Sequence, residues 1–141
     1  MSQAPSVINV LLIEDSDADA HLFASLLSEA DQRIVVTRAK DGESALERLR
    51  AGEENHPDLI VLDYHLPGRD GIETVTILRT LEGLGSVPVV FVSGLVGANR
   101  PDLKGHQNTA FFPKPDSLEN YQDFVKELVT KWLPQNLKSE S

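Results

Sequence analysis

The sequence predicts an α/β fold in which helices cover both faces of a five-stranded parallel β-sheet. Short apolar runs of strand length recur along the 141-residue chain, and stretches with helical spacing of apolar residues lie between them. Most of the apolar runs are continuous rather than alternating, which is typical of strands buried on both faces. A β-α unit repeated five times therefore indicates a doubly wound parallel sheet with right-handed crossovers.

Each expected strand is an apolar run bounded by polar or turn-forming residues. The five strands are predicted at Val7–Ile13, Ile34–Ala39, Leu59–Asp63, Val87–Ser93 and Thr109–Phe112.

Helices are expected after the first, second, third and fifth strands. Ser16 and Ser117 are typical N-cap residues for the first and last helices, and Gly52 and Gly83 follow the second and third, where helices commonly end. The positions with helical spacing are Leu22, Phe23, Leu26 and Leu27; Ala45, Leu46 and Leu49; Ile72, Val75, Leu78 and Leu81; and Leu118, Tyr121, Phe124, Val125, Leu128 and Trp132. The segment 94–108 contains three glycines and a proline, so a helix there is expected to be short or partly replaced by loop.

Composition limits the class of protein. With 13 basic and 22 acidic residues the net charge is −9, which argues against nucleic-acid binding. The absence of cysteine excludes disulfides, cysteine-based zinc sites and thiol catalysis. No apolar run approaches the length of about 18 residues that a membrane span needs, and the N-terminus does not resemble a signal peptide, so we expect a cytoplasmic protein.

Polar side chains follow the predicted strands where each strand ends. Glu14 and Asp15 follow the first strand, Asp63 ends the third, Ser93 ends the fourth and Lys114 follows the fifth. In open α/β sheets, binding sites form outside the carboxyl ends of the strands. We therefore expect these five side chains to converge at one edge of the sheet.

This combination of residue types suits phosphoryl transfer. Neighbouring carboxylates repel one another, and a bound Mg²⁺ relieves that repulsion. Mg²⁺ sites in proteins use a few oxygen ligands from the protein and fill the other coordination positions with water or phosphate. Lys114 supplies a compact positive charge and Ser93 a hydroxyl donor. An ionised aspartate beside Mg²⁺ and lysine needs no base to attack phosphorus, and the product is an aspartyl phosphate.

The ordered set of these residues resembles the receiver domain of two-component response regulators. The segment "DYHLPGRDG" (63–71) resembles the stretch after that family's phosphoacceptor. The resemblance covers residues 7–133, with short tails at 1–6 and 134–141, and implies a flavodoxin-like, CheY-like sheet of strand order 2-1-3-4-5. No output domain is expected, and the chain would be a stand-alone signalling protein with self-catalysed phosphoryl uptake and loss rather than an enzyme.

The resemblance also implies roles at the acidic end of the site. Asp63 would accept the phosphoryl group from a kinase histidine. Asp15 would bind Mg²⁺ directly and Glu14 mainly through water, and the backbone carbonyl of His65 would complete the protein ligands.

Two further positions would form the family's switch. Ser93 would move to bond the phosphoryl oxygen, beside Lys114, and Phe111 would turn inward to change the surface around the fourth and fifth α/β units. The chain departs from the family pattern in two places: the switch aromatic is Phe rather than Tyr, and "HQNT" (106–109) stands where a Gly-Ala pair is usual.

The last predicted helix ends in Trp132 and Leu133 and resembles single-domain regulators that work with phytochrome-type kinases. That resemblance implies a sensor histidine kinase or phosphotransfer protein as donor, a downstream protein target, and a homodimer formed through the C-terminal helix region. No nucleic-acid or membrane partner is expected.

Two other functions are consistent with parts of this pattern. A phosphohydrolase that uses an aspartyl phosphate also needs a strand-end aspartate and Mg²⁺, but usually has a second aspartate two residues later, where this chain has His65. A pseudo-receiver would bind partners without being phosphorylated, and the complete acidic set argues against it. Taken singly, Asp63 could cap a loop, Lys114 could be a solvated lysine, and Glu14 and Asp15 could stabilise a helix N-terminus.

Overall fold

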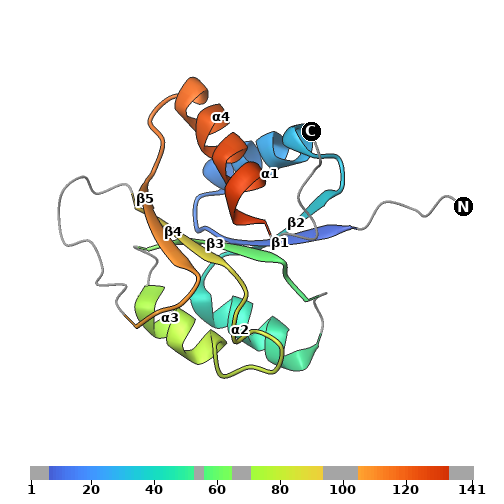
Figure 1. Cartoon of the computed structure of the whole chain (residues 1–141), viewed down its shortest axis with the longest axis vertical. Helices are drawn as coiled ribbons and strands as arrows, with labels where there is room; N and C mark the ends of the chain where they lie inside the picture. Colours follow the sequence, from blue (N-terminus) through green and yellow to red (C-terminus); the bar gives the residue numbers. More distant parts are fainter. Residues whose placement is uncertain (1–6, 53–55, 65–70, 94–104, 134–141) are drawn as a thin grey trace, which may run out of the picture.

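A computed structural model describes residues 7–52, 56–64, 71–93 and 105–133. The described elements are β1 (Ile8–Ile13), α1 (Asp17–Ala30), β2 (Ile34–Ala39), α2 (Gly42–Ala51), β3 (Leu59–Asp63), α3 (Gly71–Leu78), β4 (Val89–Ser93), β5 (Thr109–Pro113), α4 (Leu118–Glu127) and a π-helical turn, η1 (Leu128–Trp132). The strands form one parallel sheet in the order β2-β1-β3-β4-β5, which confirms the predicted fold class and strand order. The sheet lies between two helical layers, with α1 and α4 on one face and α2 and α3 on the other (Figure 1).

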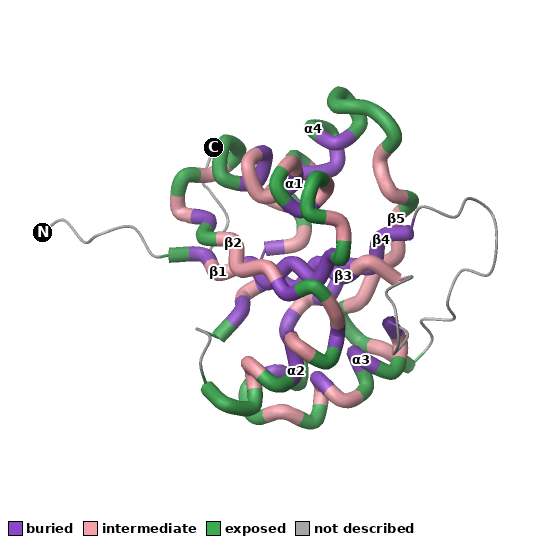
Figure 2. The backbone as a smooth tube through the Cα atoms, turned by 180° about the vertical axis from the view of Figure 1, so that it is seen from behind, coloured by how far each residue is buried: buried purple, intermediate pink, exposed green. Residues whose placement is uncertain are grey.

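The side chains of the central strand β1 divide between the two faces of the sheet, as the pleat requires. Val10 and Leu12 belong to a cluster with α1 and α4, whereas Leu11 and Ile13 belong to a second cluster with α2 and α3. Figure 2 shows the central strands β1, β3 and β4 as the most continuously buried part of the chain. Burial on both faces explains why the strand sequences are continuous apolar runs rather than alternating ones.

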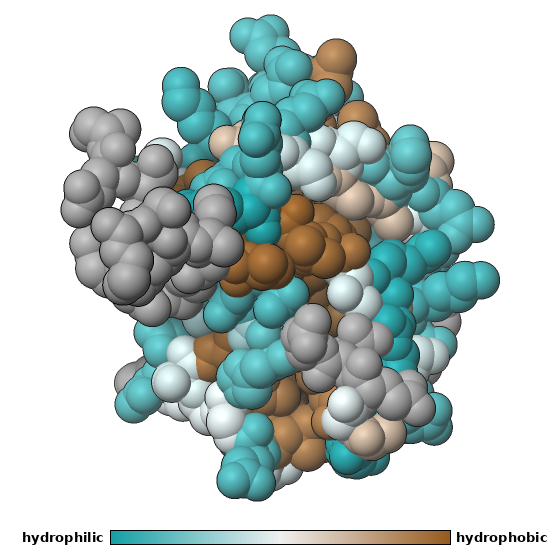
Figure 3. Space-filling model, turned by 90° about the vertical axis from the view of Figure 1, so that its right-hand side faces the viewer, coloured by the Kyte–Doolittle hydropathy of each residue, from teal (hydrophilic) through white to brown (hydrophobic). Residues whose placement is uncertain are grey.

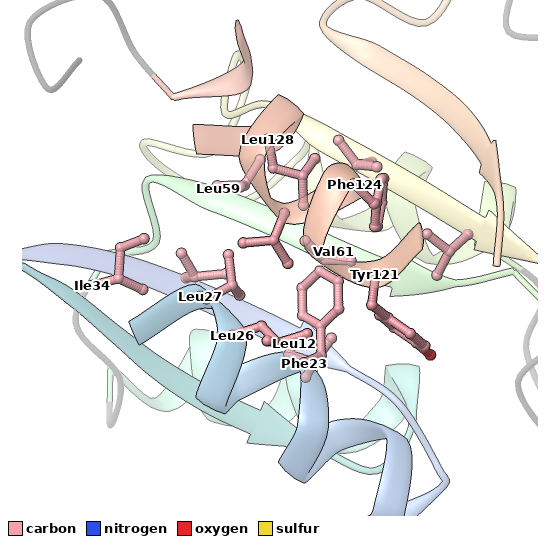
Figure 4. Packing of buried hydrophobic residues seen from close by; sticks show 14 of the residues in the cluster. Leu12, Phe23, Leu26, Leu27, Ile34, Leu59, Val61, Tyr121, Phe124 and Leu128 are labelled. Atoms are coloured by element: carbon pink, nitrogen blue, oxygen red, sulfur yellow. The ribbon is translucent and has the colours of Figure 1, made fainter. Parts of the chain in front are cut away.

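The cluster under α1 and α4 is built around aromatic side chains. Phe23 lies edge-on to Tyr121, with ring centroids 6.2 Å apart, and 5.7 Å from the ring of Phe124. Figure 4 shows these rings beside Leu12 and Val61 of the sheet. This packing fixes the N-terminal half of α4 against α1, next to the end of β5.

Helix ends largely follow the predicted signals. Ser16 and Ser117 each accept the backbone N–H of the residue three positions later, and Gly52 ends α2 with a φ of 71°. Asp41 caps α2 in the same way as the two serines, which the sequence analysis did not predict. Each cap satisfies an amide that the helix itself leaves unpaired.

Four element boundaries differ from the predictions, and one of them is the fifth strand, which ends at Pro113 rather than Phe112. The first strand begins at Ile8, because Val7 is already 54% exposed. The fourth begins at Val89, because Pro88 has no N–H to donate to a ladder, whereas the Val89 amide donates to the Asn108 carbonyl at 2.9 Å. The third helix ends at Leu78 rather than reaching Leu81.

The last helix reaches Trp132 as predicted, but its final turn is π-helical. Leu128 and Leu133 are almost fully buried, and the indole of Trp132 packs edge-on against Phe112 with centroids 6.4 Å apart. The predicted fourth-unit helix falls mainly in residues 94–104, which lie outside the described residues.

The surface seen in Figure 3 is mostly hydrophilic around a central hydrophobic area. Among the described residues, the large hydrophobic side chains that are strongly exposed are Val7, Val35 and Leu118. Within the same residues, no helix has the combined length and apolar character needed to cross a membrane.

Candidate functional site

The carboxyl ends of β1 and β3 bring the predicted acidic residues together. Carboxylate oxygens of Glu14, Asp15 and Asp63 all lie within 4.8 Å of one another. Parallel pairing of β1 with β3 places the end of one strand beside the end of the other, so three carboxylates meet although 48 positions separate Asp15 from Asp63. The convergence of these predicted site residues is confirmed.

Lys114 reaches the same cluster from the end of β5. Its ammonium Nζ lies 2.7 Å from Glu14 Oε1, 2.8 Å from Asp19 Oδ2 and 3.6 Å from Asp63 Oδ2. Its backbone N–H donates to the Ser93 carbonyl at 2.7 Å, so the pairing of β4 with β5 fixes the lysine at the edge of the sheet. One cation is thereby shared among three carboxylates.

Burial and the short ion pairs together shift the pKa values of Glu14 and Lys114. Glu14 is only 4% exposed, and this burial raises the pKa of its carboxyl, although the hydrogen bond from Lys114 opposes the shift. Burial alone would lower the pKa of Lys114, but hydrogen bonds to Asp19 and Glu14 and the charge of Asp63 outweigh it and raise that pKa. Lys114 is therefore held in its charged form at neutral pH.

The three-carboxylate cluster fits a hard divalent cation. All of its side-chain donors are oxygens, and three protein groups leave coordination positions for water or phosphoryl oxygens, as Mg²⁺ sites do. Glu14 is already engaged on both oxygens, because Oε1 accepts from Lys114 and Oε2 accepts the Ser16 N–H at 3.1 Å. Asp15 is exposed, so its carboxylate is the most accessible of the three.

Of the remaining predicted residues, the structure describes Ser93 and Phe111. Ser93, the last residue of β4, is 1% exposed. It directly follows Val92, which is the β4 partner of Asp63 in the pairing of β3 with β4. Phe111, on β5, is partly buried and lies edge-on to Tyr64, the residue after Asp63. His65 lies outside the described residues, so its predicted carbonyl ligand stays a prediction.

Two functional neighbours were missed in the sequence. Asp19 lies in the first turn of α1, and its side chain reaches Lys114; Asp15 precedes the helix, so no helical spacing between the two aspartates marked this contact. Arg38 of β2 donates from Nε to the Glu14 carbonyl at 2.8 Å and from Nη1 to Asp17 at 2.7 Å, which clamps the turn after β1. Among the described residues its buried Nη2 has no hydrogen-bond partner, and no local sequence signal marks this long-range contact.

A parallel sheet of this strand order, with carboxylates and a lysine at its carboxyl edge, defines the class of CheY-like signalling domains. The sequence profile of the response regulator receiver domain matches residues 10–120, and the chain belongs to this family. Receiver domains act in two-component signalling, interact with histidine kinases and downstream targets, and bind Mg²⁺ at an acidic pocket.

Several known members are similar along most of their length. The polar-differentiation response regulator DivK of Brucella ovis is 29% identical over 122 residues, which cover 86% of this chain and 95% of DivK. The phosphorylated cyanobacterial phytochrome response regulator RcpA, known from a crystal structure, has 28% sequence identity to this chain. The two structures superpose with a TM-score of 0.78, and the match covers 90% of this chain and 94% of RcpA. The Mn²⁺-bound form of response regulator Rcp1 is 26% identical, with a TM-score of 0.76 and coverage of 91% and 96%.

Proposed function

We propose that this receiver domain is phosphorylated on Asp63 by a histidine kinase in an Mg²⁺-dependent reaction. One observation carries the proposal: Asp63 shares a carboxylate cluster with Glu14 and Asp15, and the Lys114 ammonium lies 3.6 Å from its Oδ2. A carboxylate in such a cluster is a ready nucleophile, and the neighbouring lysine supplies charge for the incoming phosphoryl oxygens.

Asp15 and Asp63 would hold the cation directly, together with the His65 carbonyl that the family resemblance implies. The two hydrogen bonds that Glu14 already accepts support a contact through water for that residue. Bound Mg²⁺ supplies positive charge to the carboxylates and to the phosphoryl oxygens. The Mn²⁺-bound form of Rcp1 supports a divalent cation in this fold.

In the transfer step, an Asp63 carboxylate oxygen forms a bond to phosphorus while the bond from phosphorus to the kinase imidazole nitrogen breaks. The bonding electron pair goes to that nitrogen, and the product is an acyl phosphate. Lys114 would pair with a phosphoryl oxygen, and an ionised aspartate needs no base to attack phosphorus. Hydrolysis of the acyl phosphate restores the carboxylate and releases phosphate, so we expect signalling with self-catalysed phosphoryl loss rather than turnover of phosphate esters.

Ser93 and Phe111 would transmit this event to the surface of the β4 and β5 units. Ser93, buried beside Asp63, would bond a phosphoryl oxygen through its hydroxyl. Phe111 packs against Tyr64, the chain neighbour of Asp63, which supports a link between the phosphoacceptor and the β5 surface. A downstream protein would bind the altered surface.

For the donor, we propose a phytochrome-type sensor histidine kinase or a phosphotransfer protein in the cytoplasm. The similarity to RcpA, a phytochrome response regulator, supports this choice. We also propose a homodimer through the C-terminal helix region around Trp132, which is only partly buried within one chain. Sedimentation tests this dimer: a monomer with and without phosphorylation, at all concentrations, would rule it out.

Radiolabelled acetyl phosphate tests the phosphorylation site. We expect Mg²⁺-dependent labelling of the wild type, none of Asp63→Asn, and full labelling of Asp123→Asn, which removes an exposed carboxylate of α4. Labelling that survives Asp63→Asn would overturn the site. Steady hydrolysis of small phosphate esters would instead favour the phosphohydrolase alternative.

A further inference from the structure

We infer that Asp19 is a positioning residue that restrains Lys114 in the unphosphorylated protein and thereby limits how readily the phosphorylated form accumulates. This inference rests on the proposed phosphorylation of Asp63. It concerns a carboxylate that lies outside the three-carboxylate cluster, so its effect would pass through the lysine rather than through the cation.

The distances at Lys114 show that its shortest ion pairs are not with the phosphoacceptor. Glu14 and Asp19 accept from the ammonium at 2.7 and 2.8 Å, whereas the nearest Asp63 oxygen lies 3.6 Å away. A hydrogen bond at 3.6 Å is outside the normal range, so Lys114 is bonded to two other carboxylates and only close to Asp63. A phosphoryl oxygen on Asp63 would compete with the two short pairs for the position of the Lys114 ammonium.

Burial decides which of the two short pairs gives way. The Glu14 side chain is 5% exposed, and leaving a buried carboxylate without its cation is costly. The Asp19 side chain is 39% exposed, so water can replace the lysine there at small cost. Asp19 is therefore the partner that Lys114 releases.

The position of Asp19 in α1 explains how its side chain reaches Lys114. Asp19 lies in the first turn, where its own amide donates to the N-cap hydroxyl of Ser16 at 3.2 Å. That turn directly follows Asp15, so the backbone of Asp19 is fixed close to the end of β1. The side chain then meets Lys114, which arrives from β5, across the edge of the sheet.

A phosphoryl group on Asp63 would add negative charge that competes with Asp19 for Lys114. In the wild type, the Asp19–Lys114 ion pair breaks when Asp63 is phosphorylated, and the energy of that pair opposes the change. Removing the Asp19 charge frees the lysine beforehand, so the phosphorylated form and its mimics become more favourable relative to the resting form.

Beryllofluoride, which mimics a phosphoryl group on aspartate, tests this inference with Mg²⁺ present. For Asp19→Asn we expect about two- to fivefold tighter beryllofluoride binding by NMR titration, the range of a partly exposed ion pair, and slower loss of the phosphoryl group. The matched control is Asp17→Asn, which removes an equal charge from the same helix turn but from a residue paired with Arg38. Asp19→Glu keeps the charge and should behave as the wild type.

A double-substitution cycle separates pairing with Lys114 from a general field effect. In a Lys114→Gln background, Asp19→Asn should change beryllofluoride affinity no more than Asp17→Asn does. Equal effects of the two substitutions in the wild-type background, or weaker binding by Asp19→Asn, would overturn the inference while the proposed function stands. Failure of the wild type itself to bind beryllofluoride or to be labelled would instead refute the proposed function.

Discussion

The ring of Tyr64 stands edge-on to the ring of Phe111, with centroids 5.9 Å apart and planes inclined by 79°. Tyr64 makes a second edge-on contact with Phe91, at 5.7 Å and 90°. Tyr64 directly follows Asp63, so two aromatic contacts connect the end of β3 to β4 and β5. Edge-to-face pairs of this kind contribute about 0.5–1.5 kcal/mol each beyond the area they bury.

The same ring packing leaves no space for a side chain at Gly71, the first residue of α3. A Cβ there would lie 2.8 Å from Tyr64 Cδ2 and 2.9 Å from Phe91 Cε1. We expect Gly71→Ala to lower the free energy of unfolding by about 1–3 kcal/mol in urea denaturation, because the rings must shift. Gly85→Ala, whose nearest atom would be 4.0 Å away, is the control, and an equal loss for both would contradict this explanation.

Arg79 connects the end of α3 to two later segments. Its guanidinium donates to the carbonyls of Leu84 at 3.1 Å, Val87 at 2.6 Å and Gln107 at 2.8 Å. Arg79→Met keeps much of the side-chain volume but leaves these carbonyls without their donor, so we expect a loss of about 1–3 kcal/mol in the free energy of unfolding. The exposed Arg50→Met should cost under about 0.5 kcal/mol, and comparable losses would refute the bridging role.

The N-cap of α2 predicts a pH dependence. Asp41 Oδ1 accepts the Ser44 N–H at 2.7 Å, and that backbone hydrogen bond lowers the pKa of the Asp41 carboxyl. Because the folded-state pKa lies below the unfolded value of about 3.9, the stabilisation is present above that pH and is lost as the pH falls through the folded pKa.

Two substitutions at this cap separate the charge from the hydrogen bond. We expect Asp41→Ala to cost about 1 kcal/mol at pH 7, and the difference from the wild type to shrink below about pH 4. Asp41→Asn keeps a hydrogen-bond acceptor, so it should lower the free energy of unfolding at pH 7 by less than Asp41→Ala does. Because the asparagine does not titrate, its capping hydrogen bond should not weaken as the pH falls. Thermal unfolding monitored by circular dichroism at both pH values measures this, and a constant wild-type–Ala difference would contradict it.

Asp15 provides the direct test of cation binding. Because it is exposed and belongs to the carboxylate cluster, its loss should remove a ligand without disturbing the core. We expect Asp15→Asn to raise the Mg²⁺ concentration for half-maximal acetyl phosphate labelling by about tenfold or more. Asp123→Asn, at an exposed position of α4, should leave that concentration near the wild-type value; an unchanged requirement in Asp15→Asn would show that Asp15 is not a ligand.

The sheet was predictable because each strand is a separate apolar run with its own terminators. The boundaries that differed from the predictions depend on hydrogen bonds with other parts of the structure, which the local apolar pattern does not specify. Pro88 is apolar enough to continue the fourth strand, but only the ladder to β5 shows that pairing begins at Val89. Leu81 has helical spacing with Leu78, yet its amide donates to the Leu78 carbonyl in a tighter turn at 3.0 Å.

The carboxylates and Lys114 were predictable because strand ends in a parallel sheet share one edge. Asp19 and Arg38 were not, because each acts through a side chain that crosses to another element. Their partners are 95 and 24 positions away in sequence, for Lys114 and the Glu14 carbonyl respectively. Contacts of that kind depend on side-chain direction, which a strand or helix pattern does not specify.

Lys114 lies 100 positions after Glu14 in the sequence, directly after the last strand of the sheet. During synthesis from the N-terminus, the carboxylates of β1 and β3 are therefore made long before the lysine that balances them. A nascent chain that stops short of β5 carries these neighbouring carboxylates without the Lys114 ammonium. The balanced set of charges at this edge of the sheet therefore forms only after Lys114 has been made.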